Sequence, residues 1–339
     1  MHRSFPLAPF FEDPLDYVLT ELYKKAAPAK LIALREKVAS LAKLCGGQLS
    51  IGTGCSGTDV VVHVAGLILK SWRTMFGIDI KLVHALSCEN TPFKQEFIAH
   101  HFDPGHIFPD LHQLNGTSAM DIHGALVAIP LLHIWVCGIE CDSISALNTH
   151  SHQNKSCIED DGTDTRTGNT ARSCMQFIKD RKPMMFILEN VKNLAAKSHK
   201  EASNLETLIK MANRCGYYVS TSLVNTSAYG FPQARERFYI VGARTSQDGI
   251  DQFDVEFKAP EWAGDLQQTL LDLRIDPMSL GHFLLPDDHI EVLAANTAAD
   301  QASKKRLGAR RRPRPMQTLT PLLLLRARCQ RRRRSKSTR

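Results

Sequence analysis

The stretch Phe186-Ile187-Leu188-Glu189-Asn190-Val191-Lys192-Asn193-Leu194 decides the predicted fold of this chain. Its first residues continue an apolar run that is typical of a buried strand, and the run ends in a carboxylate and an amide. In an open α/β sheet, ligands bind in the crevice beyond the carboxyl ends of the strands. We therefore predict that Glu189 and Asn190 end a buried strand and face a ligand.

Two further polar segments follow predicted strands of the same kind. Upstream, the apolar run 131–138 leads into the loop Gly138-Ile139-Glu140-Cys141-Asp142-Ser143, so Cys141 also lies at a strand end. Downstream, two strands are expected, at 217–225 and 237–243. The polar loop between them carries Gln233, Arg235 and Arg237. A thiol, a carboxyl group and two guanidinium groups are thus expected at one edge of one sheet.

The N-terminal part of the chain contains the other half of the predicted sheet. A strand at 49–52 enters the turn Gly52-Thr53-Gly54-Cys55-Ser56-Gly57-Thr58-Asp59, and the apolar spacing of 60–69 predicts a helix behind it. Such a unit cradles a nucleotide or cofactor by default, because glycines let the backbone approach a ligand and the free N–H groups of the helix start meet its polar end. With a second strand at 80–87, it predicts a doubly wound, mostly parallel α/β sheet.

Two acidic residues follow the next strands of this half. Glu89 closes the strand at 80–87, where an acid is well placed to accept hydrogen bonds from both hydroxyls of a ribose. Asp110 ends a short third strand or turn at 106–110, and it is a candidate acceptor for an adenine amino group. A helix N-cap or a turn acid is an equally good interpretation of Asp110.

The segments around this predicted core are more weakly patterned. Apolar spacing predicts two helices within 14–44, separated at Ala26-Ala27-Pro28, and further helices at 171–180 and near 266–273. The polar, turn-rich segment 148–172 is expected to be a mobile loop over the site rather than part of the core.

Composition and charge limit the class of protein. The chain is 43% hydrophobic and 23% charged, and it has no apolar run of membrane-helix length and no secretory signal pattern, so an intracellular protein is expected. Its nine cysteines are scattered and lack CxxC spacing, which favours reduced thiols and no metal site. Fifteen of the 42 Lys and Arg residues lie from Lys304 onward without an acid, which leaves 27 against 35 acids in residues 1–303. This basic tail is suited to neutralising phosphates or to nuclear import, and a solvated tail without function is the alternative.

The ordered set of a Cys141 loop, Glu189-Asn190-Val191 and Gln233-Ala234-Arg235-Glu236-Arg237 resembles the cytosine-5 DNA methyltransferase family over residues 49–244. The resemblance implies methyl transfer from S-adenosylmethionine to C5 of cytosine in DNA, with Cys141 adding to C6 and Glu189 acting at N3. It implies that Asn190 fixes these two groups and that Arg235 and Arg237 hold the base or its phosphates. The implied substrate-binding residues are Gln233 and Arg235, and the implied cofactor-binding residues are Cys55, Ser56, Gly57, Thr58, Glu89, Asn90 and Asp110.

The same resemblance divides the chain into four regions. We expect N-terminal helices at 1–47, an S-adenosylmethionine-dependent catalytic domain at 48–245, a short recognition or accessory region at 246–303, and a basic, disordered tail at 304–339. The protein is expected in the nucleus or elsewhere inside the cell, with DNA or RNA as its partner and no membrane.

The chain departs from the family pattern at three places. Glu140 stands where the family has a proline before the cysteine, which removes a fixed φ and puts a negative charge beside the thiolate. Cys55 replaces an aromatic residue that packs on the adenine, and no Gly-Asn element is found near the C-terminus. Three functions stay open: methylation of DNA, the same chemistry on tRNA, and an impaired paralogue that binds nucleic acid.

Overall fold

The structure is a computed structural model, and it describes residues 26–148, 166–197, 202–245 and 259–280, with a few single positions outside these ranges, among them Tyr23 and Ile158. By its contacts the chain divides into two units, Met1–His282 and Phe283–Arg339. The first unit contains every strand that the structure describes. The predicted region 246–303 is described at 259–280 and at a few later positions, and the basic tail at 304–339 lies outside the described residues.

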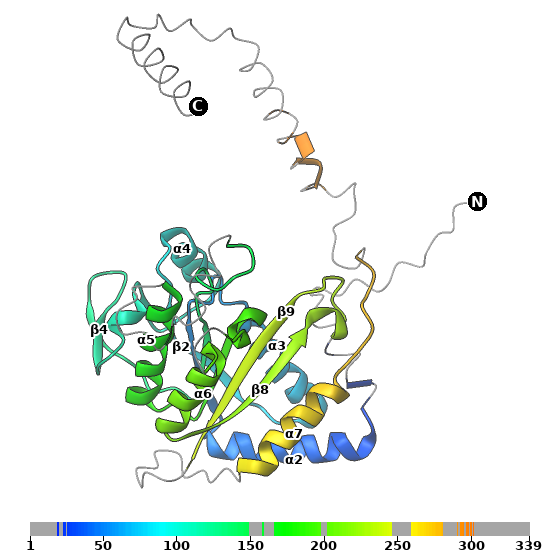
Figure 1. Ribbon diagram of the computed structural model, residues 1–339. Coiled ribbons are helices and arrows are strands. Elements are labelled where there is room, and N and C mark those ends of the chain that lie inside the picture. Colours follow the sequence, from blue (N-terminus) through cyan, green and yellow to red (C-terminus); the bar gives the residue numbers. More distant parts are fainter. Residues whose placement is uncertain are drawn as a thin grey trace, which may run out of the picture. The chain divides into compact units, whose positions relative to one another are not determined.

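One seven-stranded sheet forms the centre of the first unit (Figure 1). Its strands run in the order β3 (Ile107–Phe108), β2 (Lys81–Cys88), β1 (Gln48–Gly54), β6 (Ile134–Gly138), β7 (Met185–Val191), β9 (Glu236–Arg244) and β8 (Tyr217–Asn225). The first five strands are parallel, whereas β9 is antiparallel to both of its neighbours. The strand order reverses between β1 and β6, which is the switch point at which doubly wound sheets bind ligands. The predicted fold class is therefore confirmed.

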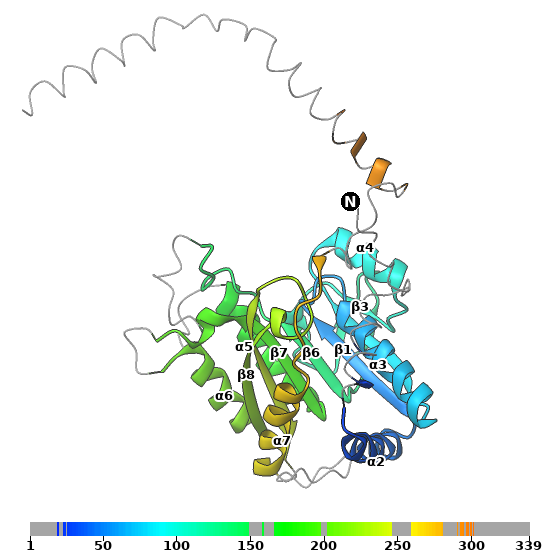
Figure 2. The ribbon, with the colours of Figure 1, turned by 90° about the vertical axis from the view of Figure 1, so that its right-hand side faces the viewer.

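Helices cover both faces of this sheet (Figure 2). On one face, α5 (Arg166–Arg181) and α6 (Asn204–Arg214) share a buried core with β6 and β7, and on the other, α2 (Pro28–Leu44) and α3 (Val60–Phe76) enclose a smaller one. Side chains of β7 alternate between half-buried and fully buried positions, so Phe186 and Leu188 face the larger core. Another helix, α7 (Ala259–Asp272), contacts the outer strand β8 through Gln267. The Gln267 amide donates to the Thr221 carbonyl oxygen over 2.8 Å.

Helix boundaries follow ordinary capping chemistry. Pro28 is the first residue of α2, where its missing N–H costs nothing, so the predicted break at Ala26-Ala27-Pro28 is confirmed. The helix predicted before it lies largely outside the described residues. Ser203 and Glu206 form a capping box at the start of α6, and Gly77 ends α3 in the left-handed conformation at φ 69°.

The structure corrects the predicted loop at 148–172. Helix α5 begins at Arg166, and Thr167, Thr170 and Ala171 are buried in its first turns. The sequence there is rich in Thr, Gly and Asn, which are weak helix formers, so packing against the sheet overrides local preference. Residues 149–157 and 159–165 lie outside the described residues.

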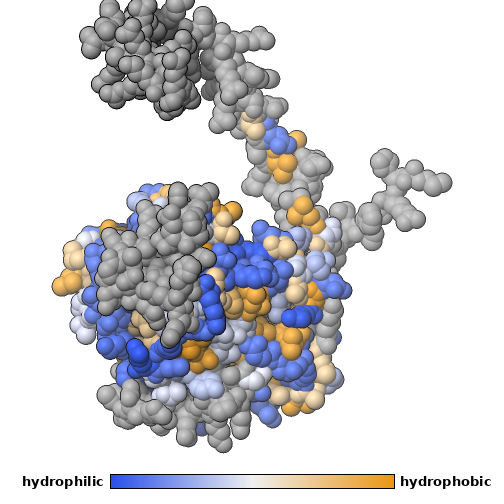
Figure 3. Space-filling view, in the orientation of Figure 1, coloured by the Kyte–Doolittle hydropathy of each residue, from blue (hydrophilic) through white to orange (hydrophobic). Residues whose placement is uncertain are grey.

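One hairpin was not predicted at all. Strands β4 (Ser118–Met120) and β5 (Leu126–Ala128) pair around a turn in which Asp121 Oδ1 accepts from the backbone N–H groups of His123 and Ala125. On the face drawn in Figure 3, apolar residues are interspersed among hydrophilic ones. Within the described residues, no helix is both long and apolar enough to cross a bilayer.

Candidate active site

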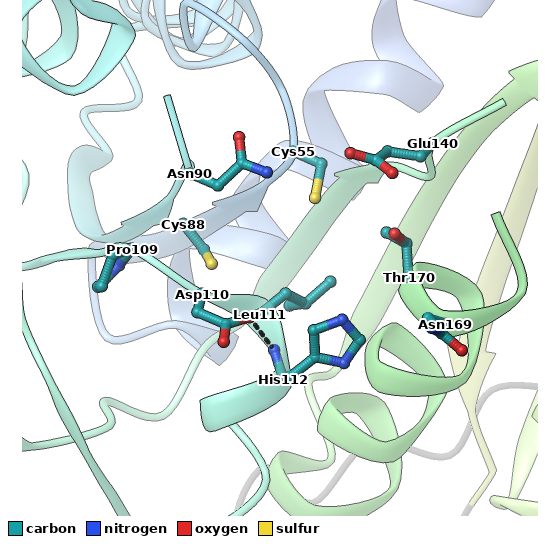
Figure 4. Close-up of a pocket in the computed structure, with 10 residues that line it drawn as sticks. All are labelled: Cys55, Cys88, Asn90, Pro109, Asp110, Leu111, His112, Glu140, Asn169 and Thr170. Carbon is teal, nitrogen blue, oxygen red and sulfur yellow. Dashed lines mark hydrogen bonds between the residues drawn. The ribbon is translucent and has the colours of Figure 1, made fainter. Parts of the chain in front are cut away.

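A cavity of about 350 Å³ opens at the carboxyl ends of the parallel strands, beside the switch point (Figure 4). Its walls come from the turn after β1, the ends of β2 and β3, the loop after β6 and the start of α5. The residues that line it are Cys55, Cys88, Asn90, Pro109, Asp110, Leu111, His112, Glu140, Asn169 and Thr170. This cavity is the place at which the sequence predicts a cofactor.

The turn after β1 is held tightly against its neighbours. Cys55 and Gly57 have positive φ angles of 51° and 77°, and the Cys55 N–H donates to the Cys88 carbonyl oxygen over 2.8 Å. On the other side, a Cβ atom at Gly138 would lie 3.0 Å from the Cys55 carbonyl oxygen. Glycine therefore suits the end of β6, because any side chain there would lie tightly against the turn's backbone.

The predicted cofactor-binding residues fall into two groups. Cys55, Asn90 and Asp110 line the cavity, and Asp110 also caps a short helix by accepting from the His112 N–H over 2.9 Å. The helix-cap interpretation of Asp110 is therefore confirmed, and its contact with an adenine amino group stays a prediction. Glu89 is 4% exposed and does not line the cavity; its Oε1 accepts from the Thr91 N–H over 3.1 Å, just before α4 (Pro92–His101).

Ser56, Gly57 and Thr58 are also absent from the lining of this cavity. They connect Cys55 in the cavity wall to the start of α3, so they would influence a ligand by setting the backbone conformation of the turn.

The cavity suits an S-adenosylmethionine molecule in its chemistry. Carboxylates of Asp110 and Glu140 and amides of Asn90 and Asn169 offer acceptors and donors for hydroxyl and amino groups. The two carboxylates favour a ligand that carries positive charge. Leu111 and the two thiols supply an apolar surface for a flat ring.

The loop that carries Cys141 is anchored by one asparagine at the end of β7 and by a second just beyond it. Asn190 is 1% exposed, and its Nδ2 donates to the Ile139 carbonyl oxygen over 3.0 Å. Asn193 Nδ2 donates to the Ile144 carbonyl oxygen over 3.0 Å, on the other side of Cys141. The prediction that Asn190 holds the cysteine loop agrees with this geometry.

Glu189 is paired with both arginines of the predicted loop. Arg237 Nε lies 2.9 Å from Glu189 Oε1, and Arg235 Nη2 lies 3.7 Å from the same oxygen. The antiparallel register of β9 on β7 produces this contact. Arg237 opposes Val191, which lies two residues after Glu189 and therefore on the same face of β7. The side chain of Glu189 is 30% exposed, that of Arg237 21% and that of Arg235 48%, so water screens both ion pairs. The two pairs therefore orient the Glu189 carboxylate more than they stabilise the fold.

Gln233 lies at the surface of the loop between β8 and β9. Its side chain is exposed, and its backbone carbonyl oxygen accepts from the Thr226 hydroxyl. Asn225 Oδ1 accepts from the Arg235 N–H over 3.1 Å, which fixes the following residues of the loop.

Cys141 is half-buried, and its surroundings disfavour the thiolate. Burial raises the pKa of Cys141, the charges of Asp142 and Glu189 raise it further, and Arg237 lowers it. We predicted that Glu140 would raise this pKa, but the largest charge effect comes from Asp142 on the other side. Glu140 lines the cofactor cavity instead.

The predicted cofactor-binding set lacks seven residues that line the cavity: Cys88, Pro109, Leu111, His112, Glu140, Asn169 and Thr170. Asn169 and Thr170 lie in the segment predicted as a loop, so no periodic signal marked them. Glu140 was singled out only as a neighbour of Cys141. Its place before the cysteine, where proline is expected, is the one signal that could have directed attention to the cavity.

Comparisons with known proteins agree with these observations. The family model for "C-5 cytosine-specific DNA methylase" matches residues 87–331. "DNA (cytosine-5-)-methyltransferase DMT5" of Cryptococcus neoformans is 28% identical over 273 residues, which cover 78% of this chain and 10% of that protein. "Type II methyltransferase M.NgoFVII" of Neisseria gonorrhoeae is 29% identical over 215 residues, which cover 63% of this chain and 46% of that protein. The chain thus matches about a tenth of the first relative and about half of the second.

A solved structure of a DNMT2 mutant from Spodoptera frugiperda superposes with a TM-score of 0.41 at 15% identity, covering 71% of this chain and 61% of that one.

Proposed function

The chain belongs to the C-5 cytosine-specific DNA methylase family, and we propose that it transfers a methyl group from S-adenosylmethionine to C5 of cytosine in DNA. One observation carries this proposal: Gly138, at the start of the Cys141 loop, opposes Glu189 in the register of β6 on β7, and Arg237 Nε lies 2.9 Å from Glu189 Oε1. A nucleophile, an acid and a cation therefore share one site beside a cavity that suits the methyl donor.

In the proposed reaction, Cys141 activates the cytosine. C5 is a poor nucleophile within the aromatic ring, so the Cys141 thiolate first adds to C6 and electron density moves through C5 and N3. Glu189 stabilises the charge that develops at N3 by hydrogen bonding there as an acid. After the methyl group has bonded to C5, loss of the C5 proton to a base restores the double bond and expels the thiolate.

Arg237 has two tasks in this account. Its contact with Glu189 Oε1 holds the carboxyl group at the end of β7, and its charge favours the Cys141 thiolate. Arg235 is more exposed and lies further from Glu189, which suits it to contact the base carbonyl or a phosphate as a planar donor.

S-adenosylmethionine supplies the methyl group when it is bound. The residues suited to holding it are those that line the cavity, with Asp110 and Asn90 on the side of β2 and β3 and Glu140 beside the cysteine loop. Because Glu140 and Cys141 are adjacent, the loop connects the two halves of the site directly.

A target cytosine in duplex DNA has to leave the stack to reach Cys141, which costs a few kcal/mol. We propose that the segment after Ser143 fills the vacated space, as the sequence suggests. Most of that segment lies outside the described residues.

A second candidate function is a protein that binds nucleic acid with little turnover. The raised pKa of Cys141 favours it, because burial, Asp142 and Glu189 all disfavour the thiolate that the reaction requires.

Transfer of tritium from labelled S-adenosylmethionine tests the proposal. Duplex DNA and total tRNA are offered separately to the wild-type protein, to Cys141→Ser and to the control Cys215→Ser, which alters another half-buried thiol. We expect label in DNA with the wild type and the control, and a loss of about 10³-fold or more with Cys141→Ser. Label in tRNA alone would replace DNA as the substrate, and binding of DNA without transfer would favour the second candidate.

Trapping tests the covalent step separately. DNA that contains 5-fluorocytosine should form a stable adduct with the wild-type protein, because fluorine at C5 blocks the release of the thiolate. Peptide mapping is expected to place the adduct at Cys141. Methyl transfer without such an adduct would overturn the covalent mechanism and leave the activity intact.

We also propose that the protein acts in the nucleus or elsewhere inside the cell and that its basic tail contacts phosphates. The proposal rests on Lys304-Lys305-Arg306 and Arg310-Arg311-Arg312, which lie outside the described residues. Deleting 304–339 should flatten the salt dependence of DNA binding, because fewer counterions are then released. An unchanged slope would show that the tail does not contribute.

A further inference from the structure

Asp59 occupies an unusual position between the cofactor turn and α3. Its backbone is left-handed, at φ 53° and ψ 29°, a conformation that costs a non-glycine residue about 1 kcal/mol or more. Its side chain is completely buried, and it makes no capping hydrogen bond to α3. Neither helix capping nor solvation therefore explains an acid at this position.

The Asp59 carboxylate is surrounded by donors instead. The Ser56 hydroxyl donates to Oδ1, and His84 Nε2 lies 3.4 Å from Oδ2. Burial by itself raises the pKa of Asp59, but the polar groups of His84, Ser56, Ser87 and Thr53 beside it outweigh this effect, so the pKa is lowered. The lowered pKa favours an ionised carboxylate inside the protein, and the His84 ring is the titratable group that lies against it.

These donors belong to three separate segments. Thr53 lies on β1, Ser56 lies in the turn, and His84 and Ser87 lie on β2. One buried carboxylate thus lies among polar groups of the turn, β1 and β2, and the turn and the end of β2 form part of the cavity wall. The charged residues near His84 on its other side are Lys81 and Asp103, which line a second cavity of about 380 Å³ with it.

This cluster lowers the stability of the fold. Thr53 Oγ1, Asp59 Oδ2, Ser87 Oγ and both ring nitrogens of His84 are buried without a partner in full hydrogen-bond geometry. Buried polar groups in native proteins are nearly always satisfied, so an incomplete set requires a reason other than stability. The cluster lies directly behind the turn, whose Cys55 lines the cofactor cavity, so a role in holding the turn explains why these polar groups are buried there.

We infer that Asp59 and His84 form a positioning pair that holds the turn Cys55-Ser56-Gly57-Thr58 in the conformation that binds the cofactor. The inference rests on the proposed function and extends it to two residues that touch neither substrate nor cofactor. The side chain of Asp59 locks the turn from behind, and His84 fixes Asp59 to β2. Loss of either should weaken cofactor binding and leave DNA binding intact.

Calorimetric titration with S-adenosylmethionine tests this on the full chain. The variants are Asp59→Asn, Asp59→Gly, His84→Leu and His84→Gln. Asparagine tolerates the left-handed backbone and lacks the charge, glycine removes the strain along with the carboxylate, and glutamine retains a donor at the position of Nε2. His133→Leu is the matched control, because His133 Nδ1 accepts from the Ser50 N–H over 3.0 Å at the opposite end of β1.

We expect Asp59→Asn, Asp59→Gly and His84→Leu each to raise the Kd for S-adenosylmethionine about tenfold, His84→Gln to restore it to within about threefold, and His133→Leu to leave it unchanged. Wild-type affinity in Asp59→Gly would overturn the inference, because the backbone conformation alone would then suffice. Equal loss in His133→Leu would also overturn it by showing a general effect of destabilisation.

Hydrogen exchange of the turn amides gives a second measurement that does not require a ligand. The amides of Cys55 to Thr58 should exchange faster in Asp59→Asn than in His133→Leu, and equal exchange would contradict the positioning role. A wild-type protein that binds no S-adenosylmethionine would overturn the proposed function together with this inference. Wild-type binding that all variants retain would overturn this inference alone.

Discussion

The cofactor side and the substrate side of the site lie at the same edge of one sheet but are built differently. The cofactor side is an open cavity between four strand ends and α5, and the acids behind it, Asp59 and Glu89, are buried. On the substrate side, Cys141 is half-buried, and the carboxylate of Glu189 and its arginines remain partly exposed.

This difference has an electrostatic consequence. Interactions in a buried cluster reach their full strength when the chain folds, so the cofactor side is preorganised. Exposed ion pairs are screened until a bound partner excludes water. The substrate side is therefore expected to gain its full strength only when DNA covers it, and the two sides should respond separately to substitution.

The largest expected difference between the two sides comes from a substitution on the substrate side that lowers methyl transfer and leaves cofactor affinity unchanged. Glu189→Gln retains the shape of the side chain and removes the acid, so methyl transfer should fall by about 10²–10³-fold, as for the loss of a general acid or base. The Kd for S-adenosylmethionine should stay within about twofold of wild type by calorimetry. A comparable loss of cofactor affinity would show that the two sides are not separable.

The next effect concerns the anchor beneath the cysteine loop. Asn190→Ala leaves the buried Ile139 carbonyl oxygen without its donor, so the free energy of unfolding should fall by about 1–3 kcal/mol. Urea denaturation measures this change. Asn193→Ala removes a similar bond in a half-buried position and should cost less, and the opposite ranking would contradict the anchoring role.

A smaller effect is expected where the two sides meet, at Glu140. Its carboxylate lines the cavity, and S-adenosylmethionine carries a positive charge that S-adenosylhomocysteine lacks. Glu140→Gln should therefore lower the affinity for S-adenosylmethionine, relative to that for S-adenosylhomocysteine, by roughly threefold. This is the size expected of one screened charge. Asp142→Asn serves as the control, and an unchanged ratio in Glu140→Gln would show that its charge does not reach the ligand.

The last expected effect, of similar size, is a gain in activity. Cys141 must lose its proton to react, and its raised pKa means that little thiolate exists at neutral pH. Methyl transfer should therefore increase as the pH rises towards that pKa. Asp142→Asn removes a negative charge, which lowers the pKa of Cys141, so the rise should move to lower pH and the rate near pH 7.5 should increase roughly twofold to fivefold. An unmoved profile would mean that Cys141 ionisation does not limit the rate.

Much of the sheet could be predicted from the sequence. The apolar runs that end at Glu189 and before Cys141 are strands, the strand at 217–225 has its predicted bounds, and the glycine-rich turn connects a strand to a helix. Each of these depends on residues next to one another in the chain. The start of α5 could not be predicted, because burial against the sheet compensates for its poor helix formers.

The site was only partly predictable. The types and order of Cys141, Glu189 and the two arginines indicated their common edge. The pairing of Arg237 with Glu189 depends on the antiparallel register of β9 on β7, which no local pattern contains. The place of Glu89 outside the cavity and the link between Asp59 and His84 are likewise results of packing.

The sequence by itself determined where strands and turns occur and which chemical groups follow them, because periodicity and turn residues act over a few neighbouring positions. Only the tertiary structure decided which of those groups touch, because contacts between residues 25 to 60 apart, such as Asp59 with His84 or Asn190 with the Ile139 carbonyl, depend on strand order, register and burial.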